Sequence, residues 1–131
     1  MTFPQTTALI AAVMAIFQVM LMLQVGFTRL NTQIGIGSGG NDTLERKIRV
    51  HGNLTENAPM FLLLLALLEG IGMSSTIIGV IGLVFFLVRI SHAYALTYTS
   101  GPHPLRTVGA FGTVICLVGT AGTLIFQALT L

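Results

Sequence analysis

Four long apolar runs alternate with three short polar segments along this chain. The apolar residues are continuous, whereas an exposed or barrel-forming strand would alternate them with polar ones, so the pattern predicts helices. We expect helices at about residues 6–28, 44–69, 76–98 and 105–129. At about 1.5 Å per residue, each is long enough to cross roughly 30 Å of hydrocarbon. The pattern therefore predicts four membrane-spanning helices.

The three connections carry turn and capping residues. Residues 31–41 are rich in glycine, residues 70–75 form a short turn, and Pro104 suits the first turn of the last helix. Asn41, Asp42 or Thr43 can cap the second helix. Glycines recur in the last two helices, where we interpret them as packing positions that allow close helix approach. The length leaves room for one bundle, residues 1–131, and for no separate soluble domain.

Composition supports a membrane protein. Of 131 residues, 53% are hydrophobic and only 8% are charged, with a mean hydropathy of +0.89. In soluble domains, about a quarter of all residues are charged. Since lipid offers no partner for backbone polar groups, only helices or closed barrels span it. We therefore predict an all-α integral membrane protein, a four-transmembrane-helix bundle in contact with the lipid bilayer.

The basic residues are unevenly distributed among the connections. Arg29, Arg46, Lys47 and Arg49 flank the first and Arg106 flanks the third, whereas the second carries only Glu69. Because Lys and Arg favour the cytoplasmic side, we expect both basic loops there and both termini outside. We interpret Glu69 as an interfacial end charge.

Other function classes find little support. The net charge of +2 comes from basic residues at the membrane edges, so we expect no nucleic-acid binding. No cysteine or second histidine stands at metal-ligand spacing, so we expect no metal site. Cys116 is the sole cysteine and excludes an intramolecular disulfide.

A polar stripe interrupts the second helix. Its members lie at helical offsets 0, 3, 7 and 10, which share one face: Arg46, Arg49, Asn53 and Glu56. Glu56 lies about 15 Å below Arg46 and thus near mid-membrane, where a carboxylate must be neutral or paired. Arg89 of the third helix lies at a similar depth, with His92 one turn closer to the surface.

Two interpretations of these residues remain open. A buried Glu56–Arg89 pair with Asn53 could fix helix register, and arginines at membrane edges can act as anchors. Alternatively, several cationic side chains form a pocket that opens to the cytoplasm and suits a small, multiply anionic ligand. The members of that pocket would be Arg29, Arg46, Arg49 and Arg106.

The second-helix pattern resembles the signature of the MAPEG family, membrane-associated proteins in eicosanoid and glutathione metabolism. The resemblance rests on Glu45-Arg46, Arg49, Asn53, Glu56 and Pro59. Residues 49–53 and the leucine run after them are similar to bacterial members. Agreement extends to Arg29, Arg89, His92 and Arg106, and it covers the chain in length and layout.

The resemblance implies a homotrimer that binds glutathione between neighbouring subunits near the cytoplasmic face, in a bacterial inner membrane. Arg49, Asn53 and Glu56 would hold the glutathione backbone, with Glu56 suited to its ammonium group. The other implied binding residues are Arg29 and Arg46 for the carboxylates, His92 as a pocket wall, and Arg89. Arg106 would be catalytic, because a guanidinium beside the sulfur increases the thiolate fraction.

Some positions differ from the family pattern. Leu96 stands where several eicosanoid-type members have tyrosine, and Asn57 where some relatives have tyrosine. The sequence thus favours a glutathione-dependent transferase or peroxidase acting on lipophilic electrophiles over specialised eicosanoid synthesis. The alternative is a non-catalytic membrane trimer that binds lipid or a small anion, or partners another membrane protein. A transporter is disfavoured because the chain lacks broken helices in paired halves.

Overall fold

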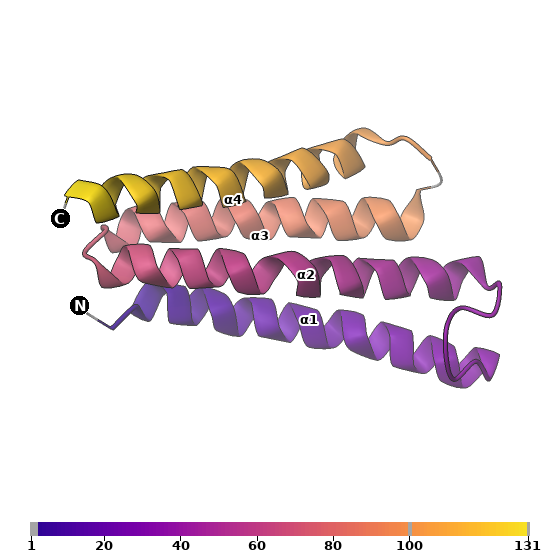
Figure 1. Ribbon diagram of the computed structural model, residues 1–131. Helices are drawn as coiled ribbons and strands as arrows, with labels where there is room; N and C mark the ends of the chain where they lie inside the picture. Colours follow the sequence, from indigo (N-terminus) through magenta and orange to yellow (C-terminus); the bar gives the residue numbers. More distant parts are fainter. Residues whose placement is uncertain (1–2, 100, 131) are drawn as a thin grey trace.

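Helices account for most of the computed structural model, which describes residues 3–99 and 101–130 (Figure 1). Within these residues the helices are α1 (Gln5–Thr32), α2 (Asp42–Gly70), α3 (Ser75–Tyr98) and α4 (Pro104–Thr130), and there is no strand. The helices run up and down, so that the start of α1 and the end of α4 lie at one end of the bundle. We call this the termini end, and the end with the α1–α2 and α3–α4 connections the loop end. The predicted all-α membrane bundle is confirmed.

Local capping explains where α2 begins. The Asn41 side chain accepts a hydrogen bond of 2.9 Å from the Leu44 backbone N–H, and Asp42 and Glu45 lie in the first turn. Both features favour a helix N-terminus, since a side-chain oxygen satisfies an otherwise unpaired donor and acidic groups complement the helix dipole. Of the three expected caps, Asn41 is the one used.

The start of α1 is stabilised by a different helix. Its N-cap residue, Pro4, makes no side-chain cap, and Glu69 at the end of α2 takes that role. The Glu69 carboxylate accepts hydrogen bonds from the backbone N–H groups of Thr6 (2.9 Å) and Thr7 (2.7 Å), and from the Thr7 hydroxyl (2.7 Å). Glu69 does lie at the end of α2, but the sequence did not predict that its carboxylate is buried and joins α1 to α2.

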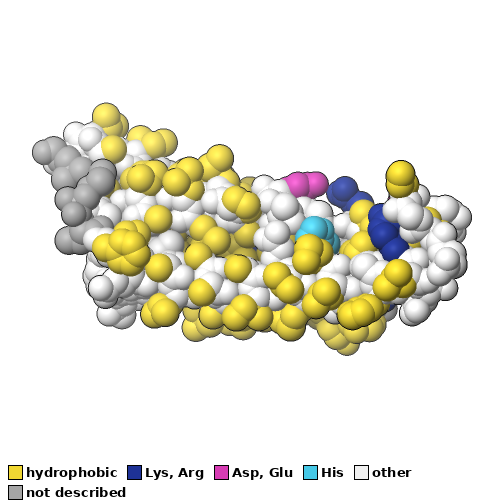
Figure 2. All heavy atoms as spheres, turned by 90° about the horizontal axis from the view of Figure 1, so that it is seen from below, with side chains coloured by type: hydrophobic (Ala, Val, Ile, Leu, Met, Phe, Trp, Pro, Cys, Tyr) yellow, Lys and Arg dark blue, Asp and Glu magenta, His cyan; other side chains and the backbone are white. Residues whose placement is uncertain are grey.

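The core runs along α2 and α3. The rings of Phe61 and Phe85 stack with centroids 3.7 Å apart, and both side chains are fully buried. Many apolar side chains point outward, and Figure 2 shows hydrophobic side chains spread along most of one face. Three helices, α1, α3 and α4, are long and apolar enough to cross a membrane by length and composition. The helix α2 is not among them, because its first half is rich in charged and polar residues.

Candidate functional site

Arg89 forms a polar junction between three helices. It is 2% exposed, and its Nη1 donates to the Thr113 hydroxyl of α4 at 2.9 Å. Its Nη2 donates to Asn53 Oδ1 of α2 at 2.5 Å. A buried guanidinium is costly unless its donors find acceptors, so these two bonds hold α2, α3 and α4 in one register. We call these three residues the Arg89 junction.

The junction replaces the Glu56–Arg89 pair that the sequence suggested. Arg89 has no hydrogen bond to a carboxylate among the described residues, and Glu56 is exposed on the outside of the chain. The reason is angular: three residues along a helix correspond to about −60° around its axis. Asn53 faces α3, and this rotation turns Glu56 away from it.

The junction also gives a reference point for the positions of Arg46 and Arg106 along the bundle axis. Arg46 precedes Asn53 by seven residues on α2, and Arg106 precedes Thr113 by seven on α4. Because α2 and α4 run in the same direction, both arginines lie about 10 Å nearer to the loop end than the junction (Figure 1). Arg46 is half-buried and its Nη1 donates to the Thr99 carbonyl at 2.8 Å, whereas Arg106 is exposed.

Charged side chains are exposed along the first half and at the middle of α2. Glu56 lies fourteen residues from either end of this helix, about 21 Å along the axis, and Arg49 lies seven residues from its start. Both are exposed on the isolated chain. Figure 2 shows acidic and basic side chains standing among hydrophobic ones on the face in view. Within lipid, an uncovered carboxylate halfway along a helix would be unfavourable, so this face would favour a partner.

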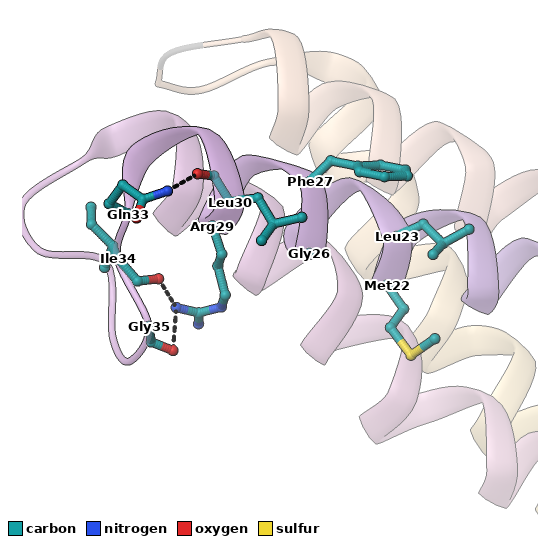
Figure 3. A pocket seen from close by; sticks show the side chains of 9 residues that line it. All are labelled: Met22, Leu23, Gly26, Phe27, Arg29, Leu30, Gln33, Ile34 and Gly35. Carbon is teal, nitrogen blue, oxygen red and sulfur yellow. Dashed lines mark hydrogen bonds between the residues drawn. The ribbon is translucent and has the colours of Figure 1, made fainter.

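Arg29 lies apart from the other arginines. Its Nη1 donates to three carbonyls of the α1–α2 connection, those of Ile34 (3.1 Å), Gly35 (3.2 Å) and Gly37 (2.9 Å). Figure 3 shows the guanidinium directed at this loop, beside an open hollow of about 610 Å³. The walls of the hollow are mostly apolar: Met22, Leu23, Gly26, Phe27, Arg29, Leu30, Gln33, Ile34 and Gly35.

A single chain therefore does not enclose the predicted cationic pocket. Within the described residues α1 packs against α2 and α3 but not against α4, so Arg29 and Arg106 belong to separate parts of the bundle. The hollow beside Arg29 contains none of the other predicted site residues. The physical reason is topological, because α2 and α3 lie between α1 and α4 (Figure 1).

His92 and Arg89 lie inside the bundle and not on its outer surface. His92 is 7% exposed, and its backbone is packed against Gly109 of α4. The buried Nδ1 of His92 and Nε of Arg89 have no hydrogen-bond partner within the described chain. Sequence reasoning missed Thr113, although it lies on the same α4 face as Arg106, two turns further on.

Comparison with known proteins gives the following matches. The sequence pattern that defines the MAPEG family matches residues 7–126 of this chain. The inner membrane protein YecN of Escherichia coli (strain K12) is 27% identical over 90 residues, covering 66% of this chain and 69% of YecN. YecN of Escherichia coli O6:H1 (strain CFT073) matches with the same identity and coverage.

Proposed function

Since this chain belongs to the MAPEG family, we propose that it is a membrane-embedded, glutathione-dependent transferase or peroxidase that acts on lipophilic electrophiles. Such substrates partition into the bilayer and reach the protein from there. The observation that carries the proposal is the pair of charged side chains exposed on α2 of the isolated protomer, Arg49 and Glu56. A peptide-like ligand with an ammonium group and two carboxylates has the charges that complement them.

The same observation supports assembly of several copies, which the family resemblance implies to be a homotrimer. One chain leaves Arg49 and Glu56 uncovered and keeps Arg29 on the opposite side of the bundle from α4. A neighbouring copy would cover the exposed charges and bring its own α1 toward α2 and α4. The site would then lie between subunits, as the family resemblance implies. This arrangement explains why the pocket is incomplete in a single protomer.

The residues of α2 would bind and orient the ligand. The Asn53 amide oxygen is held by Arg89, so the Asn53 NH2 group is the part that can donate to a ligand carbonyl. Glu56 would pair with the ligand ammonium, and Arg46 and Arg49 with carboxylates. Arg29 already binds three loop carbonyls, and its remaining N–H groups would serve a carboxylate.

Arg106 would supply the catalytic charge. When bound, glutathione provides the thiol, and the role of the chain is to favour the ionised sulfur. A guanidinium stays protonated and stabilises a nearby thiolate electrostatically. The first turn of α4, which begins at Pro104, adds positive potential in the same direction.

The cellular location of the protein is also part of the proposal. The curated relatives are named as inner membrane proteins, and we propose this membrane for the chain described here. The basic residues near the loop end favour placing that end in the cytoplasm, with the termini outside. We treat residues 1–131 as one transmembrane domain.

A non-catalytic trimer that binds lipid or a small anion is the second candidate. The burial of Arg89 and His92 favours it, because two of the predicted ligand-binding side chains are withdrawn from the surface.

The two candidates differ in one measurable signal, the ultraviolet absorption of the thiolate when glutathione binds to the purified protein in detergent. We expect this band in the wild type and an about tenfold smaller thiolate fraction at neutral pH in Arg106→Ala, equivalent to about 1.4 kcal/mol. Arg106→Lys, which keeps the charge, should retain part of the band. A folded wild-type trimer without the band would support the non-catalytic candidate.

A further inference from the structure

Building on the proposed function, we propose that the seam between α3 and α4 positions Arg106, with Ser91 and Gly109 as the positioning residues. Neither residue would touch the ligand. They act by fixing the backbone on both sides of Arg106, so that its guanidinium projects from a set place.

Ser91 holds the residue before Arg106. Its hydroxyl donates to the Leu105 carbonyl at 3.1 Å, across from α3 to the first turn of α4. Residues 104–108 are all exposed, and the backbone N–H groups of Leu105, Arg106 and Thr107 donate locally to His103. The Ser91 hydrogen bond therefore ties an exposed helix start to a neighbouring helix at the position adjacent to Arg106.

Gly109 fixes the chain one turn after Arg106. A Cβ at this glycine would lie 2.4 Å from the His92 Cβ, 2.7 Å from its Cα and 2.9 Å from its backbone nitrogen. These are contacts with the root and main chain of His92, which cannot rotate away as a flexible side-chain end could. The α4 backbone thus rests directly on that of α3, and any side chain at 109 would force the helices apart.

The contacts continue to the Arg89 junction. Leu105, Gly109 and Thr113 follow at intervals of four residues, so they form one ridge along α4 that faces α3. Each member meets an α3 residue: Ser91, His92 and Arg89 respectively. Arg106 stands beside this ridge. Displacing a catalytic group by about 1 Å can lower a rate by about a hundredfold. The contacts along this ridge would therefore affect the reaction rate through the position of Arg106.

The main test compares two glycines of the same helix. Gly109→Ala should displace the start of α4, whereas Gly119→Ala is the matched control, because nothing lies within 4 Å of a Cβ there. In folded trimers we expect Gly109→Ala to lower the thiolate fraction of bound glutathione and kcat by about tenfold or more, with KM for glutathione changed by less than about threefold. Gly119→Ala should match the wild type in all three.

A second pair of variants removes the risk that Gly109→Ala does not fold. Ser91→Ala deletes only the hydrogen bond to Leu105, and Ser91→Thr keeps a hydroxyl that can restore it. We expect a severalfold smaller thiolate band in Ser91→Ala, recovery in Ser91→Thr, and unchanged thermal unfolding in both.

The outcomes separate the two proposals. A wild type without a thiolate band refutes the proposed function, and the positioning role with it. A wild type with the band, together with wild-type thiolate fraction and kcat in folded Gly109→Ala or in Ser91→Ala, refutes the positioning role alone.

Discussion

At the scale of single residues, the contacts of Arg89 show how a charge is accommodated in the bundle interior. Its two terminal nitrogens donate to neutral oxygens of Asn53 and Thr113, which come from different helices. Neutral acceptors bind the two terminal nitrogens without neutralising the charge, and Nε has no partner among the described residues. The residue therefore contributes more to helix register than to net stability, as buried charges commonly do.

This role predicts the effect of removing one acceptor. Thr113→Val keeps the shape of the side chain but leaves Arg89 Nη1 without its partner, so we expect a loss of about 1–3 kcal/mol in the free energy of unfolding. Reversible unfolding in mixed micelles would measure it. Thr123→Val is a suitable control, because among the described residues the Thr123 hydroxyl binds only the Gly119 carbonyl of its own helix. Equal stability of the two variants would contradict the role given to the junction.

At the scale of elements, the start of α1 is completed by another helix. The N-terminus of α1 uses the Glu69 carboxylate, which lies 62 residues away from Thr7 in the sequence. The beginning of α2 is the contrast, because its cap, Asn41, is adjacent in sequence. Local caps can be predicted from sequence, whereas caps supplied by another helix cannot.

Glu69 gives a prediction at this scale. Glu69→Ala should leave the Thr6 and Thr7 N–H groups unpaired and lower the free energy of unfolding by about 1–2 kcal/mol, the usual cost of losing an N-cap. Hydrogen exchange should then be faster at the start of α1 than at the start of α2. Glu45→Ala is the matched control, since Glu45 is an exposed carboxylate bound only by the Ser38 hydroxyl. Unchanged exchange at Thr6 and Thr7 would refute this role of Glu69.

At the scale of the whole molecule, the main feature is the mismatch between a predominantly apolar surface and the charges exposed along α2. A single chain in lipid would leave Glu56 uncovered at mid-membrane. Assembly resolves the conflict if a second copy covers the stripe, and it would complete the site at the same time. Ligand binding and oligomerisation would then depend on the same surface of α2.

Glu56 allows this link to be examined. Because it is exposed on the protomer, we expect Glu56→Gln to fold and assemble but to bind glutathione at least about tenfold more weakly, through the lost pair with the ligand ammonium. Calorimetry would give the affinity, and native mass spectrometry the subunit number. Glu45→Gln should bind as the wild type does. Unchanged affinity in Glu56→Gln would exclude the ammonium contact, and a monomeric wild type would exclude the intersubunit site.

The sequence by itself determined that this protein is an all-α membrane bundle of four helices, because long continuous apolar runs have few other solutions in lipid. It also determined that Arg46, Arg49, Asn53 and Glu56 share one face of α2, since helical periodicity depends only on spacing.

Only the tertiary structure decided which groups meet across helices. The partners of Arg89, the burial of Glu69 and the separation of Arg29 from Arg106 all depend on the rotation and register of whole helices. Those two quantities result from the packing of many side chains at once, and a spacing rule within one helix carries no information about them.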